Sequence, residues 1–211
     1  MQLISVNIGE ERSITTKSGK SGIYKVSTTD SVPITKNGIK GDVIIDVNHH
    51  GGVDQAIYIY GVTDYEWWSQ ELNKELEAGI FGENLTISNL ESATLCIGDR
   101  LQVGEVLLEV TAPRIPCSTL AARMEDPKFV KRFMQADRYG AYCRVIDEGD
   151  VIAGDDVNII LYDGERISIN ELAHIYYNGG LTEEQLRRFL DVPIAIRARE
   201  DLEQKLAKIA G

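Results

Sequence analysis

The stretch that decides the fold of this chain is RLQVGEVLLEVT, residues 100–111. Two runs rich in Val and Leu flank the pair Gly104-Glu105, and this pattern predicts a β-hairpin because glycine tolerates the positive φ of a tight turn. The same alternation of short apolar runs and Gly-Asp turns extends from the first residues to about residue 165, with further strands expected at 43–46, 56–60 and 141–146. This part of the chain therefore predicts an all-β barrel.

Two helices are expected within this β region. The pair Thr63 and Glu66 has the spacing of a capping box, which predicts a helix that begins at Thr63 and continues to Gly79. The pair Asp126-Pro127 predicts the start of a second helix, because aspartate caps a helix and proline suits its first turn. We expect the first of these helices to pack on the barrel as an insertion.

The pattern becomes helical after about residue 165. Two further capping-box pairs, Ser168 with Glu171 and Thr182 with Gln185, mark helix starts, and an apolar helical period continues from Ala195 to the end. The expected fold class is therefore mainly β with α: a β-barrel domain over residues 1–165, followed by a three-helix C-terminal module over residues 166–211.

Composition and charge exclude several classes of protein. With 43% hydrophobic and 26% charged residues, the sequence is typical of a soluble globular protein. No apolar run approaches the roughly 20 residues of a membrane span, and no signal-peptide pattern is seen, so a cytoplasmic protein that does not enter a membrane is expected. The net charge of -11 argues against binding to a nucleic-acid polymer. Residues 1–40 nevertheless carry six Lys and Arg against three acids, which suits a segment that faces an anion.

The three cysteines, Cys96, Cys117 and Cys143, are too few and too widely spaced for a disulfide framework or a zinc-type CxxC site. Cys117 differs from the other two because it ends the proline-stiffened loop PRIPC, in which Arg114 favours the thiolate form. Residues 114–144 hold seven bases against three acids. Cys117 is therefore the candidate metal-thiolate ligand, whereas a small buried hydrophobic side chain is the better interpretation of the other two.

Other motifs carry weaker signals. The segment SGKSG, residues 18–22, resembles the end of a phosphate-binding loop, but Ile14 stands where that loop needs glycine, which leaves either an anion-holding loop around Lys20 or a solvated turn. Adjacent side chains on a strand point to opposite faces, so His49 and His50 are not expected to share one metal ion. A hydrolase built from Cys117 and His50 is compatible with their spacing but has no positive support.

Several motifs occur in an order that resembles the MOSC family (molybdenum cofactor sulfurase C-terminal domain), and within it the YiiM-like proteins. The match covers nearly the whole chain. The motifs are GIKGD (38–42), HGGVDQA (50–56) with Tyr60, FGENL (81–85), PRIPC (113–117), RYGAY (138–142) and GDVIAGD (149–155).

This resemblance implies a MOSC β-barrel in which the thiolate of Cys117 ligates the molybdenum of a pterin cofactor, with Cys117 and His50 as the catalytic residues. It implies that Lys20, Lys25 and Arg114 hold the pterin phosphate. It further implies that His50, Asp54, Asn84 and Arg138 line the cofactor pocket.

The resemblance also implies an activity, the reduction of N-hydroxylated compounds such as hydroxylaminopurines or amidoximes. Electrons would come from a separate flavin or iron-sulfur reductase, since the sequence has no motif for carrying its own. The alternative is a non-catalytic carrier of the molybdenum cofactor or of activated sulfur, with Cys117 as the acceptor. Both functions use the same thiol, and the sequence does not separate them.

Overall fold

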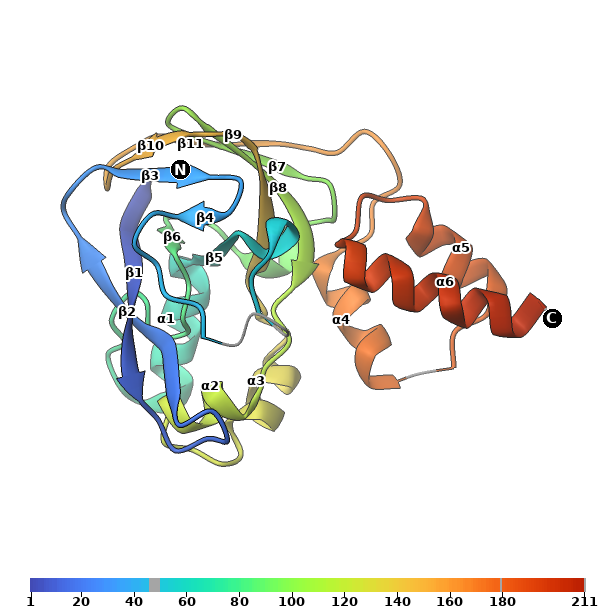
Figure 1. The fold of residues 1–211 in the computed structure, drawn as a ribbon, viewed down its shortest axis with the longest axis horizontal. Helices are drawn as coiled ribbons and strands as arrows, with labels where there is room; N and C mark the ends of the chain where they lie inside the picture. The colour runs from blue at the N-terminus through green and yellow to red at the C-terminus, as the bar shows by residue number, and fades with distance from the viewer. Residues whose placement is uncertain (46–49, 179, 211) are drawn as a thin grey trace.

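The computed structural model describes residues 1–45, 50–178 and 180–210 of the chain. Its principal element is an eight-stranded sheet with the strand order β11-β7-β8-β9-β5-β6-β1-β2 (Figure 1). The strands are β1 (Leu3–Ser13), β2 (Lys20–Thr28), β5 (Ile57–Gly61), β6 (Leu85–Ile87), β7 (Arg100–Val103), β8 (Val106–Pro113), β9 (Ala141–Asp147) and β11 (Val157–Ile160). A second sheet has the order β10-β3-β4, formed by Gly149–Val151, Val32–Thr35 and Gly38–Ile39.

The large sheet is strongly curled but has two ends. Its neighbouring strands are antiparallel except for β5 and β6, which are parallel. The curl brings the start of β1 back to the segment before β11, where Gln2 and Asp156 form an isolated bridge and the Leu3 amide donates to the Asp155 carbonyl at 2.9 Å. In the part of the chain that the structure describes, no ladder joins β11 to β2. The expected mainly β fold with C-terminal helices is confirmed, although the sheet is not a closed barrel.

The hairpin at residues 100–111 forms as predicted. Arg100 pairs with Glu109 and Val103 with Val106, and Gly104 takes a φ of +53° at the turn. Leu101 and Leu108 are fully buried. By contrast, the strand expected at 43–46 is wrong for residues 43–45, and Asp46 lies outside the described residues. A further strand beside β1 would bond to the Gly9 amide through a backbone carbonyl. The carboxylate of the preceding Asp42 accepts that hydrogen bond instead, at 2.7 Å.

The helices next to the sheet are α1 (Val62–Leu72), α2 (Ser118–Arg123) and α3 (Phe129–Ala136), with short 3-10 turns η1 (Val53–Gln55) and η2 (Ser92–Thr94). Aromatic side chains join α1 to α3: the ring of Trp68 lies 5.1 Å from Phe129 and 5.7 Å from Phe133, centroid to centroid. This buried cluster accounts for the packing of the helices, since each large aromatic ring removes much apolar surface from water.

Two helix starts differ from the prediction. No side chain caps α1, which begins at Val62, and the helix ends at Leu72 because Asn73 adopts the left-handed conformation, well before Gly79. The capping box at Thr63 is therefore wrong. The second helix begins at Phe129 rather than at Asp126, because the Asp126 carboxylate accepts the Lys128 amide in a turn before the helix.

The C-terminal helices are α4 (Ile169–Asn178), α5 (Glu183–Leu190) and α6 (Ile196–Ala210), which lie together beside β7 and β8 in Figure 1. Both atom pairs of the capping box between Thr182 and Gln185 are present, and Ser168 accepts the Glu171 amide at 3.1 Å. Neither these helices nor the others among the described residues are long and apolar enough to cross a membrane.

Candidate functional site

Cys117 lies at the junction between β8 and α2. Strand β8 ends at Pro113, and Cys117 precedes the first residue of α2 in an extended conformation. Two prolines restrict the loop between these elements, because the ring of proline fixes φ. The thiol is only partly buried, and its Sγ atom lies 4.0 Å from the Nε2 atom of His50. Two residues that are far apart in the sequence therefore meet at one sulfur atom.

The surroundings of Cys117 favour its thiolate form. Burial by itself raises the pKa of the thiol, but the hydrogen bond with His50, the charge of Arg114 and the amide of Leu120 lower it, with a net decrease from 9.0 to about 6. The buried thiol of Cys143 is the opposite case, because burial raises its pKa strongly. The lowered pKa therefore favours the thiolate of Cys117, the form in which a cysteine acts as a nucleophile or as a soft metal ligand.

Arg114 contributes a buried charge that has no carboxylate partner among the described residues. Its side chain lies under the rings of Tyr58 and Phe133, with Cζ 5.6 Å and 5.9 Å from the ring centroids. The residue is only 4% exposed, and its NH1 atom has no hydrogen-bond partner in the part of the chain that the structure describes. A buried charge is costly unless something compensates for it. The Cys117 thiolate supplies part of that compensation, and the free donor suits an anionic ligand.

Lys25 is also buried, but its charge is already paired. Its Nζ atom lies 2.5 Å from both carboxylate oxygens of Asp42. Burial lowers the pKa of Lys25, and the neighbouring Asp42 partly opposes this effect. Asn84 completes the group: its amide nitrogen donates to Asp42 at 2.9 Å, and its oxygen accepts the Tyr58 amide at 3.0 Å.

One cavity of about 120 Å³ collects most of the predicted site residues. Gly22 shows how closely the chain packs at its wall, since a Cβ atom there would lie 1.8 Å from the Val43 carbonyl oxygen. The exposed Lys20, which pairs with Glu11, also reaches this cavity. The predicted residues in its lining are Lys20, Lys25, His50, Asn84, Arg114 and Cys117.

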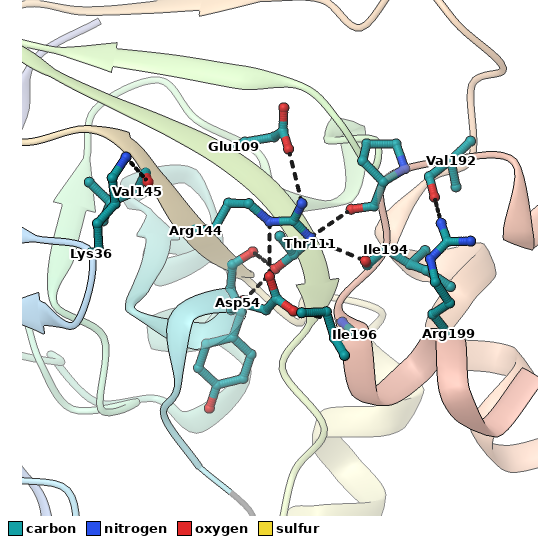
Figure 2. A network of polar contacts seen from close by, with 12 residues as sticks. Lys36, Asp54, Glu109, Thr111, Arg144, Val145, Val192, Ile194, Ile196 and Arg199 are labelled. Carbon is teal, nitrogen blue, oxygen red and sulfur yellow. Dashed lines mark hydrogen bonds and ion pairs between the residues drawn. The ribbon is translucent and has the colours of Figure 1, made fainter.

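Two predicted pocket residues, Asp54 and Arg138, do not line that cavity. Asp54 pairs with Arg144 at 3.0 Å and accepts the amide of Ile196 at 2.6 Å, which connects η1 to the start of α6 (Figure 2). Arg138 donates to the buried Asp64 at 2.7 Å. The neighbouring His49 lies outside the described residues, so of the two adjacent histidines only His50 is placed.

Two tyrosines of the site were not predicted from the sequence. Tyr58 and Tyr142 both line the cavity, their rings lie 5.1 Å apart, and both face the charge of Arg114. Burial raises the pKa of Tyr142, and Arg114 lowers it in part, so the hydroxyl stays protonated near neutral pH. The signal that could have found Tyr142 was its place in the RYGAY motif, next to the predicted Arg138.

Comparison with known proteins identifies the family. The model of the MOSC domain matches residues 46–158. The Bacillus subtilis (strain 168) protein YflK is 30% identical over 190 residues, which cover 89% of this chain and 86% of YflK. A Gibberella moniliformis protein named Reductase is 34% identical over 144 residues, 66% of this chain but only 26% of that protein.

A solved structure gives the same result for the fold. The crystal structure of YiiM from Geobacillus stearothermophilus matches with a TM-score of 0.79 and 27% sequence identity, over 97% of this chain and 98% of that one. The similarity therefore includes the helices that follow the sheet. The chain belongs to the MOSC domain family, and within that family it is similar to YiiM.

Proposed function

We propose that this chain binds the molybdenum cofactor through Cys117 and reduces N-hydroxylated compounds with electrons from a separate reductase. The observation that carries the proposal is that the thiol of Cys117 and the buried guanidinium of Arg114 line one cavity, where the NH1 atom of Arg114 has no hydrogen-bond partner among the described residues. The pKa of the thiol is lowered to about 6, which agrees with a ligand role. The MOSC domain, named after the C-terminal domain of molybdenum cofactor sulfurase, supplies the link to molybdenum.

The residues of the cavity fit such a cofactor. A thiolate is a soft ligand, as suits a metal that already carries sulfur ligands. The free NH1 donor of Arg114 suits a phosphate oxygen, because a guanidinium binds phosphate with directed, charge-assisted hydrogen bonds. Lys20 adds positive charge at the surface of the same cavity. Cys117 would hold the metal, and Arg114 with Lys20 would hold the anionic end.

When bound, the cofactor supplies two-electron redox chemistry at the metal. In the net reaction the N–O bond of the hydroxylamino group breaks, two electrons come from the reductase, two protons are taken up, and the amine and water are formed. The chain's own contribution is to position and protonate the substrate. His50 and Tyr142 both lie at the cavity of Cys117, and the protonated hydroxyl of Tyr142 can donate to the departing oxygen.

A separate electron donor is part of the proposal. The relative named Reductase supports it, because the region similar to this chain makes up only 26% of that protein. We infer that a flavin or iron-sulfur reductase supplies here the electrons that the reaction requires.

The experiment is to produce the protein in cells that make the cofactor and to follow the reduction of 6-N-hydroxylaminopurine. Turnover is expected only with the wild type and an added flavin or iron-sulfur reductase, whereas Cys117→Ala is expected to be inactive. Cys96→Ala is the matched control, because it removes a thiol that lies outside the cavity. Molybdenum bound through Cys117 without turnover with any reductase would overturn the enzyme assignment and favour a carrier.

A further inference from the structure

A second, larger cavity adjoins Cys117. It has a volume of about 470 Å³, within the usual range of small-molecule sites. It shares His50, Gln55, Cys117, Thr119 and Tyr142 with the first cavity. We infer that this second cavity is the substrate chamber of the protein and that helix α6 forms one of its walls. This inference rests on the proposed function, since it assigns the place where the substrate meets the Cys117 site.

The α6 wall consists of Ala195, which precedes the helix, and of residues in its first turn. Ala195, Arg197 and Ala198 line the second cavity, and none of them lines the first. Ala195 and Ala198 are only 5% and 6% exposed, so their small side chains leave space rather than face solvent. The C-terminal helices therefore supply part of a site whose chemistry lies in the sheet domain.

A polar network holds this wall in place (Figure 2). Asp54 accepts the Ile196 amide at 2.6 Å and pairs with Arg144, which donates in turn to the carbonyls of Pro193 and Ile194 at 3.2 Å and 3.1 Å. The Ala195 amide donates to the carbonyl of Thr111 at 3.1 Å. Because Thr111 belongs to β8, the strand that leads to Cys117, the network fixes the distance between the helix and the thiol.

The two cavities differ in the ligands that they suit. Arg114, Lys20 and Lys25 line the first cavity and not the second. Six of the thirteen residues that line the second cavity are apolar, and no Asp or Glu lines it among the residues that the structure describes. Its apolar lining consists of Ala112, Pro113, Ile115, Pro116, Ala195 and Ala198.

This difference divides the roles of the cavities. The first cavity suits the anionic end of a cofactor, whereas the second suits an uncharged molecule that is partly apolar. Among the residues that the structure describes, the charged cluster of Arg114, Lys20 and Lys25 is confined to the first cavity. The proposed occupant of the second cavity is therefore the uncharged, N-hydroxylated substrate.

The chamber can be tested on the protein without cofactor. Ala198→Phe places a large ring in the second cavity, and Ala207→Phe, on an exposed position of the same helix, is the matched control. Alkylation of Cys117 is followed by mass spectrometry with uncharged N-phenylmaleimide and with the small anion iodoacetate. Ala198→Phe is expected to slow N-phenylmaleimide about tenfold, equivalent to about 1.4 kcal/mol, and to change the iodoacetate rate less than about twofold. The control is expected to change neither rate.

The same variants are then tested with cofactor and reductase. Ala198→Phe is expected to keep its molybdenum content and to raise KM for 6-N-hydroxylaminopurine about tenfold. If Ala198→Phe fails to fold, Arg197→Trp, at an exposed position of the same wall, replaces it. Equal slowing of both reagents, or of neither, would overturn the chamber even if Cys117 binds molybdenum. If the proposed function is wrong but the chamber is right, the wild type would contain no molybdenum, while Ala198→Phe would still slow only N-phenylmaleimide.

Discussion

Replacement of His50 by alanine is expected to raise the pKa of Cys117 above its value of about 6. The hydrogen bond from His50 is the largest of the effects that lower this pKa. A hydrogen bond to a charged group contributes roughly 1.5 kcal/mol or more, and about 1.4 kcal/mol corresponds to a change of one in pKa. The Cys117 Sγ and His50 Nε2 atoms are 4.0 Å apart, so this hydrogen bond lies at the weak end of that range.

The direction of the pH effect follows from the ionised form. The thiolate is the reactive species, so alkylation accelerates as pH rises through the pKa. At pH 6 about half of the wild-type thiol is ionised. A loss of about 1.4 kcal/mol of thiolate stabilisation in His50→Ala should lower the alkylation rate there about fivefold. At pH 9 both proteins are fully ionised and should react at similar rates.

The assay is the pH dependence of iodoacetamide alkylation at Cys117, followed by mass spectrometry from pH 4 to pH 10. His174→Ala is the control, because this exposed histidine pairs with Asp137 and does not line either cavity. A wild-type midpoint near 9, or an unchanged midpoint in His50→Ala, would refute the reasoning.

Three further predictions concern charge and packing. Phosphate at a hundredfold excess over its Kd should stabilise the wild type by about 2.7 kcal/mol and so raise its melting temperature. Arg114→Met should show no such rise because it lacks the NH1 donor, and equal shifts in calorimetry would contradict this. Asp54→Ala should cost about 2 kcal/mol, because it leaves Arg144 and the Ile196 amide without this acceptor. That cost lowers the melting temperature by about 4–8 °C, and an unchanged melting curve would show that the network does not stabilise the fold. Gly22→Ala should lower the free energy of unfolding by about 3 kcal/mol, because its Cβ would lie 1.8 Å from the carbonyl oxygen of Val43. Urea unfolding measures this, and an unchanged midpoint would be evidence against that contact.

Local patterns in the sequence predicted much of the fold. The hairpin at residues 100–111 and the capping box of Thr182 depend on residues that are close in the chain, and both form as expected. The start of α1 could not be found in this way. The helix follows β5 directly after Gly61, and no side chain caps its first turn, so the sequence carries no capping signal at this point.

The candidate site was predictable in its residue types and less so in its geometry. Cys117 and Arg114 were recognisable from the PRIPC loop, but the absence of a carboxylate beside Arg114 among the described residues is a property of the packed structure. Asp54 was predicted to line the cofactor pocket because it belongs to the HGGVDQA motif. In the structure its side chain instead accepts the amide of Ile196 at the start of α6. The second cavity was not predictable, since residues 195–198 meet the Cys117 loop only in the folded chain.

The central claim is that Cys117 holds the metal of the cofactor, and the molybdenum content of purified protein tests it most directly. Wild type and Cys96→Ala, produced in cells that make the cofactor, are expected to contain about one molybdenum atom per chain, while Cys117→Ala contains almost none. Equal molybdenum content in all three proteins would contradict the account.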